Sequence, residues 1–368
     1  MYYALLFFIP MLLVMGMVKL YFHLEYTWKE FAIQSGVTLA VVVALFLGAG
    51  AWQTSDTKIV NGVVTELDPK KESCPSGWRS MRDGHCTEYR TRQVYSHTTC
   101  SGVGNSRTCT KHYDTEYKYH YPWETRYFVY SDIKQTYEIS RVDSQGVNTP
   151  PRFAEIEVGD AVSTTVNYTN YIKGAADSLF SEEDPVEPLP IAYPKIRDYY
   201  KAYRVILTNT QPDSDLWETW NDSFMQVNAD IRETGANAII VVTDSKWKDL
   251  PEALARNWDA HNINDVVTVI GRTGDTVDWV DVRSWSDNSL VNLEIQNEVM
   301  NLGTLDTAQI NAIIKTAIMD NYEAKSMDDF EYLVDDIAPP MWAFILATLI
   351  LLIVTPGVTY LFHKHDIA

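Results

Sequence analysis

The stretch FAIQSGVTLAVVVALFLGAGAW, residues 31–52, contains no charged side chain. An α-helix rises ~1.5 Å per residue and the hydrocarbon core of a membrane is ~30 Å thick, so a helix of this length can cross it. The stretch ends on Trp52, an aromatic residue of the kind that gathers where a membrane meets water. It predicts a transmembrane helix, and the remaining chain must then be divided between two sides of a membrane.

Two further apolar runs have a similar character. ALLFFIPMLLVMGMV begins at residue 4 and extends to residue 22 if Lys19 snorkels, and MWAFILATLILLIVTPGVTYLF covers residues 341–362. The first run could instead be a cleaved signal peptide, but it lacks a basic n-region and a clean small-residue cleavage site. We therefore expect three transmembrane helices: an N-terminal hairpin in residues 1–52, with spans at about 4–22 and 31–52, and a C-terminal span with a short tail in residues 339–368.

The charges that flank these runs predict an orientation. Lys19 and Lys29 lie in the loop between the first two runs, and Lys364 lies in the C-terminal tail. By the positive-inside rule these segments are cytoplasmic, which places the large middle region on the periplasmic side of a bacterial inner membrane. The whole chain carries 30 basic and 49 acidic side chains, a net charge of −19. Such a chain repels nucleic acid, so we expect the lipid bilayer as a partner and no nucleic acid.

The middle region divides into two parts of different pattern. Residues 53–198 are rich in Tyr and Thr with period-2 alternation, as in KIVNGVVTEL and CTKHYDTEYKYHY, and predict a β-rich domain. Residues 199–338 alternate helical and strand patterns, and Gly235 and Asp306 are placed as a helix C-cap and N-cap. The expected fold class is thus an α+β membrane protein with a β-rich domain and a layered α/β domain.

The chain has four cysteines, all in the β-rich part: Cys74, Cys86, Cys100 and Cys109. Their spacing contains no CxxC pair of the kind found in zinc ribbons, and an even count in an exported β region favours disulfides. The last two flank the turn of a predicted hairpin and the first two flank another turn-rich loop, so we expect the bonds Cys74–Cys86 and Cys100–Cys109. A zinc site supplemented by nearby histidines is the alternative if the domain is cytoplasmic, and the candidates are His85, His97 and His112.

The second part of the middle region resembles a known family. A helix, ANAIIVVTDS, a second helix, NDVVTVIGRTGDTVDWVDVRSW and then paired helices are similar in pattern to the TPM domain, over about residues 214–332. The resemblance implies a small membrane-anchored α/β domain, with calcium binding and phosphatase activity reported for some members. The sequence SWSDNSL departs from the glycine-rich stretch that the family has here, which weakens the expectation of activity. The whole chain also resembles uncharacterised membrane proteins of large tailed bacteriophages.

Aspartates are the candidate metal ligands of the α/β part. Asp244, Asp265 and Asp287 flank predicted strands, and carboxylates on loops at strand ends suit Ca²⁺. The alternative is a solvated acidic surface. Asp278 and Asp281 have an odd spacing, so they face opposite sides of a strand and cannot both bind one ion.

A single histidine of this part, His261, is expected near the end of a helix, where an imidazolium would meet the helix dipole favourably. A structural role for it is favoured over a catalytic one. The sequence contains no GxSxG, P-loop or HExxH motif that would indicate an enzyme. No residue is therefore assigned as catalytic.

Two functional hypotheses remain open. Tyrosine and tryptophan crowd the β-rich part, where they form either cross-strand packing pairs or a binding face. A binding face on a membrane-tethered domain predicts a non-enzymatic scaffold or interaction protein that forms a homo-oligomer, with another membrane or envelope protein as a further partner. The second hypothesis is a Ca²⁺-dependent phosphatase-like hydrolase of the TPM type.

Overall fold

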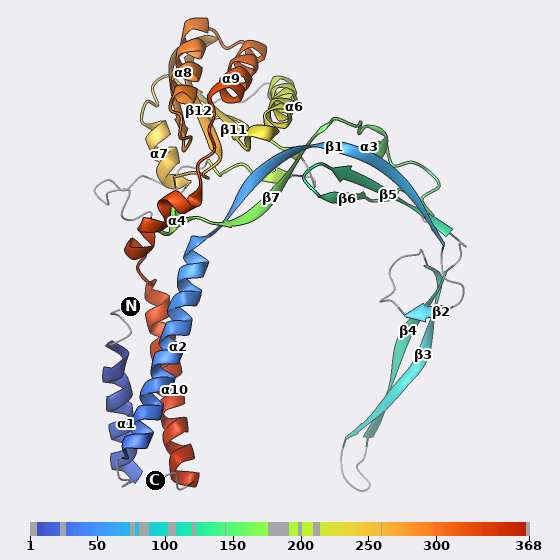
Figure 1. The fold of residues 1–368 in the computed structure, drawn as a ribbon. Helices are drawn as coiled ribbons and strands as arrows, with labels where there is room; N and C mark the ends of the chain where they lie inside the picture. The colour runs from blue at the N-terminus through green and yellow to red at the C-terminus, as the bar shows by residue number, and fades with distance from the viewer. Residues whose placement is uncertain are drawn as a thin grey trace.

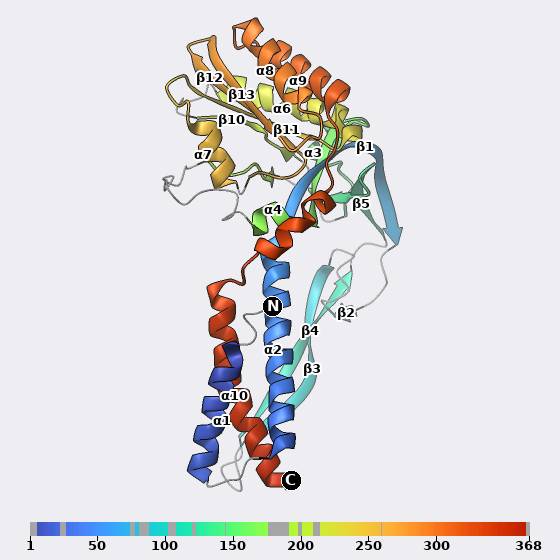
Figure 2. The same cartoon turned by 60° about the vertical axis from the view of Figure 1, so that its left-hand side comes forward.

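The protein is a mixed α+β structure with a helical bundle at one end and two β-containing modules at the other (Figure 1). A second view shows the bundle extending from the underside of both modules (Figure 2). The computed structural model describes residues 6–22, 27–73, 78–80, 88–101, 108–119, 123–143, 145–175, 191–197, 201–208, 214–258 and 260–365.

Three helices form the bundle: α1 (Phe8–Phe22), α2 (Trp28–Thr54) and α10 (Met341–His365). Residues Trp28–Thr54 and Met341–Lys364 are long and apolar enough to cross a membrane. The third is shorter: α1 has 15 residues, which span only about 22 Å at 1.5 Å per residue. Two of the three expected spans are thus present at full length, and the third is a shorter apolar helix beside them.

An ion pair joins α1 to α2 inside the bundle. Lys19 lies within α1 and not in the loop after it; it does not snorkel to water but is buried, and its ammonium bonds the carboxylate of Glu30, which is also buried. One turn further along α2, Gln34 donates to the hydroxyl of Thr359 on α10 at 2.7 Å. An aromatic cluster adds to this packing, because Phe7 stacks with Phe344 at 6.1 Å between ring centroids. All three helices therefore share one interior.

The first module is an antiparallel sheet built on one long strand. β1 (Ser55–Ser73) begins immediately after α2, and its first half pairs with β7 while its second half pairs with β5. The strand order is β6-β5-β1-β7. Its apolar face packs on Phe153 and Ile156 from the segment after β6. The other elements are β5 (Trp123–Ser131), β6 (Thr136–Ile139), α3 (Pro151–Ala154), β7 (Ala161–Thr169) and α4 (Tyr171–Gly174).

A two-stranded ribbon hangs from the far end of β1, apart from the helical bundle in Figure 1. It consists of β3 (Glu88–Ser101) and β4 (Thr108–Tyr119), with β2 (Trp78–Ser80) alongside β4. Cys100 pairs with Cys109 in the register, and the two sulfurs are bonded. The prediction of this disulfide is confirmed, so these two thiols are not available to a zinc ion. Cys74 and Cys86, and with them the other predicted bond, lie outside the described residues.

The second module has three layers around a sheet of order β10-β11-β12-β13. The first three strands are parallel and β13 is antiparallel to β12. Helices α6, α8 and α9 cover one face, and α7 covers the other together with Ile191 and Tyr193. The strands are β10 (Val205–Leu207), β11 (Asn237–Asp244), β12 (Asp265–Thr273) and β13 (Thr276–Ser284).

The helices of this module begin and end at residues that the sequence indicates. Asp306 accepts from the backbone N–H groups of Ala308 and Gln309 at the start of α9, and Gly235 has the left-handed conformation at the end of η4, the 3-10 turn that follows α6. The elements are α6 (Ser214–Asp230), the 3-10 helix η4 (Arg232–Thr234), α7 (Leu250–Asn257), α8 (Leu290–Leu302) and α9 (Thr307–Asn321).

A small apolar cluster joins the two modules just above the bundle. Ile172 of α4 packs with Ile263 and with Phe330 of η5 (Met327–Asp336), the 3-10 segment that leads into α10. Two short strands, β8 (Ile196–Arg197) and β9 (Lys201–Ala202), pair with each other beside β7. The cluster thus holds the two modules together close to where α2 ends and α10 begins.

Candidate functional site: a buried polar junction and the pocket beside it

The three candidate aspartates do not share a site. Asp244 ends β11 whereas Asp265 begins the parallel strand β12, and the register places them seven residues apart along the strands, about 23 Å at ~3.3 Å per residue. Asp287 follows β13, where its carboxylate bonds the ammonium of Lys325 at 2.8 Å. The described residues contain no group of three or more Asp, Glu, His or Cys side chains that could hold a metal ion. The structure therefore gives no support to a Ca²⁺ site made of these three side chains.

Asp265 is instead a buried acceptor with several protein donors. Its side chain is fully buried, and it accepts from Tyr193 Oη at 3.0 Å, from Asn237 Nδ2 at 2.8 Å and from the backbone N–H of Asn262 at 2.9 Å. Burial raises its pKa to about 6, although these hydrogen bonds and the charge of Arg204 favour the ionised form. Oxygen atoms that are already bonded to protein donors are poorly placed to bind a cation.

Arg204 provides the matching buried cation. It lies directly before β10, only 1% of its surface is exposed, and burial lowers its pKa to about 10. The guanidinium crosses to the first module, where it donates to Oδ1 of Asn61 on β1 and to Oγ of Ser163 on β7 at 2.8 Å. An arginine this deeply buried is unusual, so the interaction across the modules has to supply the hydrogen bonds that water would otherwise make.

Asparagines extend the same network through the junction. Asn61 Nδ2 donates to the carbonyl of Ala236 at 3.1 Å, and Asn264 Nδ2 donates to the carbonyl of Ile59 at 2.9 Å. Tyr168 of β7 donates to Oδ1 of Asn262 at 2.9 Å. These bonds join β1 and β7 of the first module to the start of the parallel sheet, so the two modules form one body at this junction.

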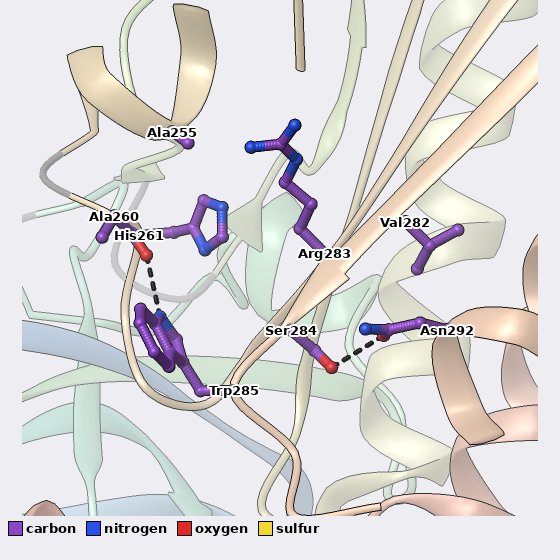
Figure 3. Close-up of a pocket in the computed structure, with 8 residues that line it drawn as sticks. All are labelled: Ala255, Ala260, His261, Val282, Arg283, Ser284, Trp285 and Asn292. Carbon is purple, nitrogen blue, oxygen red and sulfur yellow. Dashed lines mark hydrogen bonds between the residues drawn. The ribbon is translucent and has the colours of Figure 1, made fainter. Parts of the chain in front are cut away.

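A cavity of about 380 Å³ lies beside the junction, between the end of α7, β13 and α8 (Figure 3). His261 extends into it beside Arg283, and Ser284 donates to Oδ1 of Asn292 at 2.7 Å on its other side. Trp285 Nε1 donates to the carbonyl of Ala260 at 2.9 Å and closes the lower wall. The size is in the range of small-molecule sites.

His261 differs from its expected role. It lies beyond the end of α7 with a left-handed backbone (φ 51°), and the same holds for Ala260 before it (φ 66°). Burial, with a smaller effect of Arg283, lowers its pKa to about 4. The ring is therefore neutral at neutral pH, not an imidazolium stabilised by a helix dipole. Its Nδ1 atom is buried without a hydrogen-bond partner.

The hydrogen bonds of the junction hold the side chains of Asp265 and Arg204 in fixed positions. The hydroxyl of Ser284 donates to an amide oxygen, not to a histidine, so no activated nucleophile forms around it. Sequence reasoning missed Arg204 and Tyr193 because each lies in a short segment between stronger patterns. The run Asn262–Asp265, polar and directly before an apolar strand, was the one available signal of a buried polar cluster.

Comparison with known proteins gives no relative from which a role could be transferred: no family model, no curated protein and no solved structure matches this chain.

Proposed function

We propose that this chain is a non-enzymatic, membrane-anchored scaffold that assembles with further copies of itself through the ribbon β3–β4. In this proposal three helices cross a bacterial inner membrane and both modules lie in the periplasm. The α/β module is of the TPM type and the chain is of bacterial or phage origin, both on the sequence pattern alone. The observation that carries the proposal is the exposure of the ribbon on both of its faces.

The ribbon is built like an interaction element. Between residues 91 and 100 and between 109 and 116 nearly every side chain is exposed, on both faces. Tyr95 and Tyr113 are 53% exposed each and contact each other edge to face, with ring centroids 6.2 Å apart. A two-stranded ribbon in water is marginally stable by itself, so the cross-strand disulfide supports its shape. Exposed tyrosines on a stabilised ribbon are typical of binding surfaces.

The charge of the ribbon favours a second copy as the partner. The strands β2, β3 and β4 carry five basic residues (Arg79, Arg90, Arg92, Lys111, Lys118) and three acidic ones (Glu88, Asp114, Glu116), a net +2. The whole chain is −19, so everything outside these strands carries −21. By sequence, these strands and the rest of the chain are therefore opposite in sign, which favours association between copies.

A scaffold also requires a body that keeps its shape, and the buried junction provides it. Arg204, Asn61 and Asn264 join the modules by hydrogen bonds within protein, away from water. Bonds of this kind are costly to break because each separated group would lose a partner. The ribbon is therefore presented on a body anchored by both α2 and α10.

Packing and charge support the proposal that three helices cross the membrane and that both modules lie on its periplasmic side. The Lys19–Glu30 pair and the contact of Phe7 with Phe344 hold α1 in the bundle. Charged side chains within membrane helices usually face the interior of a helical bundle and pair there, as these two do. The disulfide Cys100–Cys109 favours an oxidising compartment for the ribbon. The same orientation follows from Lys29 and Lys364 on the cytoplasmic side.

Crosslinking in native membranes tests the proposal. We expect a photo-activated crosslinker that does not depend on lysine to give oligomers of the full chain, and the double substitution Arg92→Glu with Lys111→Glu to reduce them strongly, because it reverses exposed charge on the ribbon. The double substitution Lys246→Glu with Lys248→Glu is the matched control, since it makes the same change of net charge at two exposed lysines of the α/β module. Monomer alone in the wild type contradicts self-assembly, and equal loss with the control assigns the effect to net charge and not to the ribbon.

A further inference from the structure

Two histidines face each other across the ribbon. His97 and His112 are register partners, and their rings are stacked with centroids 4.6 Å apart and planes 12° from parallel. Cys100 and Cys109 lie three residues further along each strand, an odd number, so they are on the opposite face. The ribbon therefore has a covalent bond on one face and an imidazole pair on the other.

A hydroxyl engages one nitrogen of each ring. Ser96 Oγ lies 3.2 Å from Nδ1 of His97, and Thr99 Oγ1 bonds Nε2 of His112. When these ring N–H groups donate to the hydroxyls, the lone pairs lie on the other nitrogens, His97 Nε2 and His112 Nδ1. Metal-ligating histidines have this arrangement, in which a hydrogen bond to the second nitrogen fixes the tautomer and the ring orientation.

We propose that His97 and His112 together bind one divalent transition-metal ion of the Zn²⁺, Ni²⁺ or Cu²⁺ class across the ribbon. Imidazole nitrogen suits these ions. Two metal–nitrogen bonds of ~2.1 Å place the nitrogens at most about 4.2 Å apart. Because each lone pair lies in the plane of its ring, the two rings must turn out of their parallel stack to share one ion, and both side chains are exposed and have room to do so. No third protein ligand joins them among the described residues, so water completes the coordination and the ion exchanges with solvent.

Binding of this ion does not depend on the scaffold role or on the TPM resemblance. Its structural effect is a second cross-strand link, on the face that the disulfide leaves open. Protons compete for the same lone pairs, so the ion is released on acidification.

Histidine footprinting on the full chain in detergent tests this site, with Zn²⁺ as the probe and EDTA as the reference. We expect Zn²⁺ to protect His97 and His112 from diethyl pyrocarbonate at the same metal concentration, as read for each histidine by peptide mass spectrometry. In His97→Asn the protection of His112 is expected to disappear, and in His112→Asn that of His97, because neither ring alone is a chelate.

A matched control and a folding control keep the result decisive. Thr98→Ala, which removes a side chain on the opposite face at the neighbouring register position, is expected to leave the joint protection unchanged. Each variant is first shown to form the Cys100–Cys109 bond, which verifies that the ribbon has paired. Wild-type histidines that react equally fast with Zn²⁺ and with EDTA overturn the proposal, as does protection of one histidine that persists when the other is asparagine.

Discussion

The guanidinium of Arg204 reaches out of the α/β module and donates to Oδ1 of Asn61 on the long strand β1. Asp265, at the other side of the same network, is held by Tyr193, Asn237 and Asn262. The stability of the two joined modules is therefore linked to the buried cation of Arg204 and the buried carboxyl group of Asp265, and the first two predictions concern these two residues.

Removal of Arg204 is expected to be strongly destabilising. Arg204→Met leaves Oδ1 of Asn61 without this donor and removes a charge that favours the ionised form of Asp265. We expect the free energy of unfolding to fall by about 3 kcal/mol or more, as for other buried polar groups that lose a partner. Chemical denaturation in detergent measures it. Arg92→Met is the control, because its ion pair with Glu116 is exposed and should contribute less than about 1 kcal/mol.

The buried carboxyl group of Asp265 gives the stability a specific pH dependence. Its folded-state pKa of about 6 lies above the ordinary 3.8, so between these values the folded protein binds a proton that the unfolded chain does not. The contribution of Asp265 to the free energy of unfolding is fully present below about pH 4 and is lost as pH rises through about 6. At 1.36 kcal/mol per pH unit the difference is roughly 3 kcal/mol.

Asp265→Asn isolates this contribution because the amide does not titrate. The variant is expected to gain stability relative to the wild type as pH rises from 4 to 7, as measured by denaturant titrations across that range. Asp306→Asn should show the opposite sign, and only below about pH 4, since hydrogen bonds from Gln309 and Ala308 lower the pKa of Asp306 below its ordinary 3.8 and its contribution is lost as pH falls through that lowered value. If the free energies of unfolding of the wild type and of Asp265→Asn change with pH in parallel, the pKa of Asp265 is not elevated in the folded protein.

The disulfide of the ribbon is expected to act locally. Cys100→Ser with Cys109→Ser opens a loop with a sequence separation of 9, which costs about 2–3 kcal/mol in the loop-entropy account. We expect faster hydrogen exchange of amides in β3 and β4, and unchanged exchange in β11 and β12. Faster exchange in both regions would show that the ribbon and the body unfold together.

The ion pair between α1 and α2 is expected to hold the first helix in the bundle. Glu30→Leu leaves the buried ammonium of Lys19 without this partner, which costs about 3–5 kcal/mol. We expect a cysteine at Phe7 and one at Phe344 to crosslink in the wild-type background and poorly in Glu30→Leu. The exchange variant Lys19→Glu with Glu30→Lys should restore the crosslink, and failure to do so would assign the effect to packing and not to charge.

Local patterns in the sequence were enough for much of the fold. The charge-free run that ends at Trp52 gave a full-length helix, and the cysteines on either side of a turn gave a disulfide at matched register positions. The first apolar run gave a helix as well, α1, while its expected start at residue 4 lies outside the described residues. Lys19 illustrates the limit of such patterns, since its partner Glu30 lies on a different helix.

The candidate site depended on contacts that no local pattern contains. Asp265 was interpreted as a possible calcium ligand because carboxylates at strand ends are usually accessible. Its burial is produced by Tyr193, Asn237 and a neighbouring module, which are distant in sequence. Asp244 is the last residue of β11 and Asp265 is the first residue of the neighbouring parallel strand β12, so the two carboxylates lie at opposite ends of the strands.

No linker separates the anchor from the sheet, since Thr54 is the last residue of α2 and Ser55 the first of β1. The backbone N–H of Asn170, after β7, also donates to the carbonyl of Thr54 at 2.6 Å. The direction of α2 therefore determines the direction in which β1 leaves the bundle, with no flexible segment between them. Because β1 has 19 residues and pairs with strands of the first module along its whole length, the orientation of α2 also determines the orientation of that sheet.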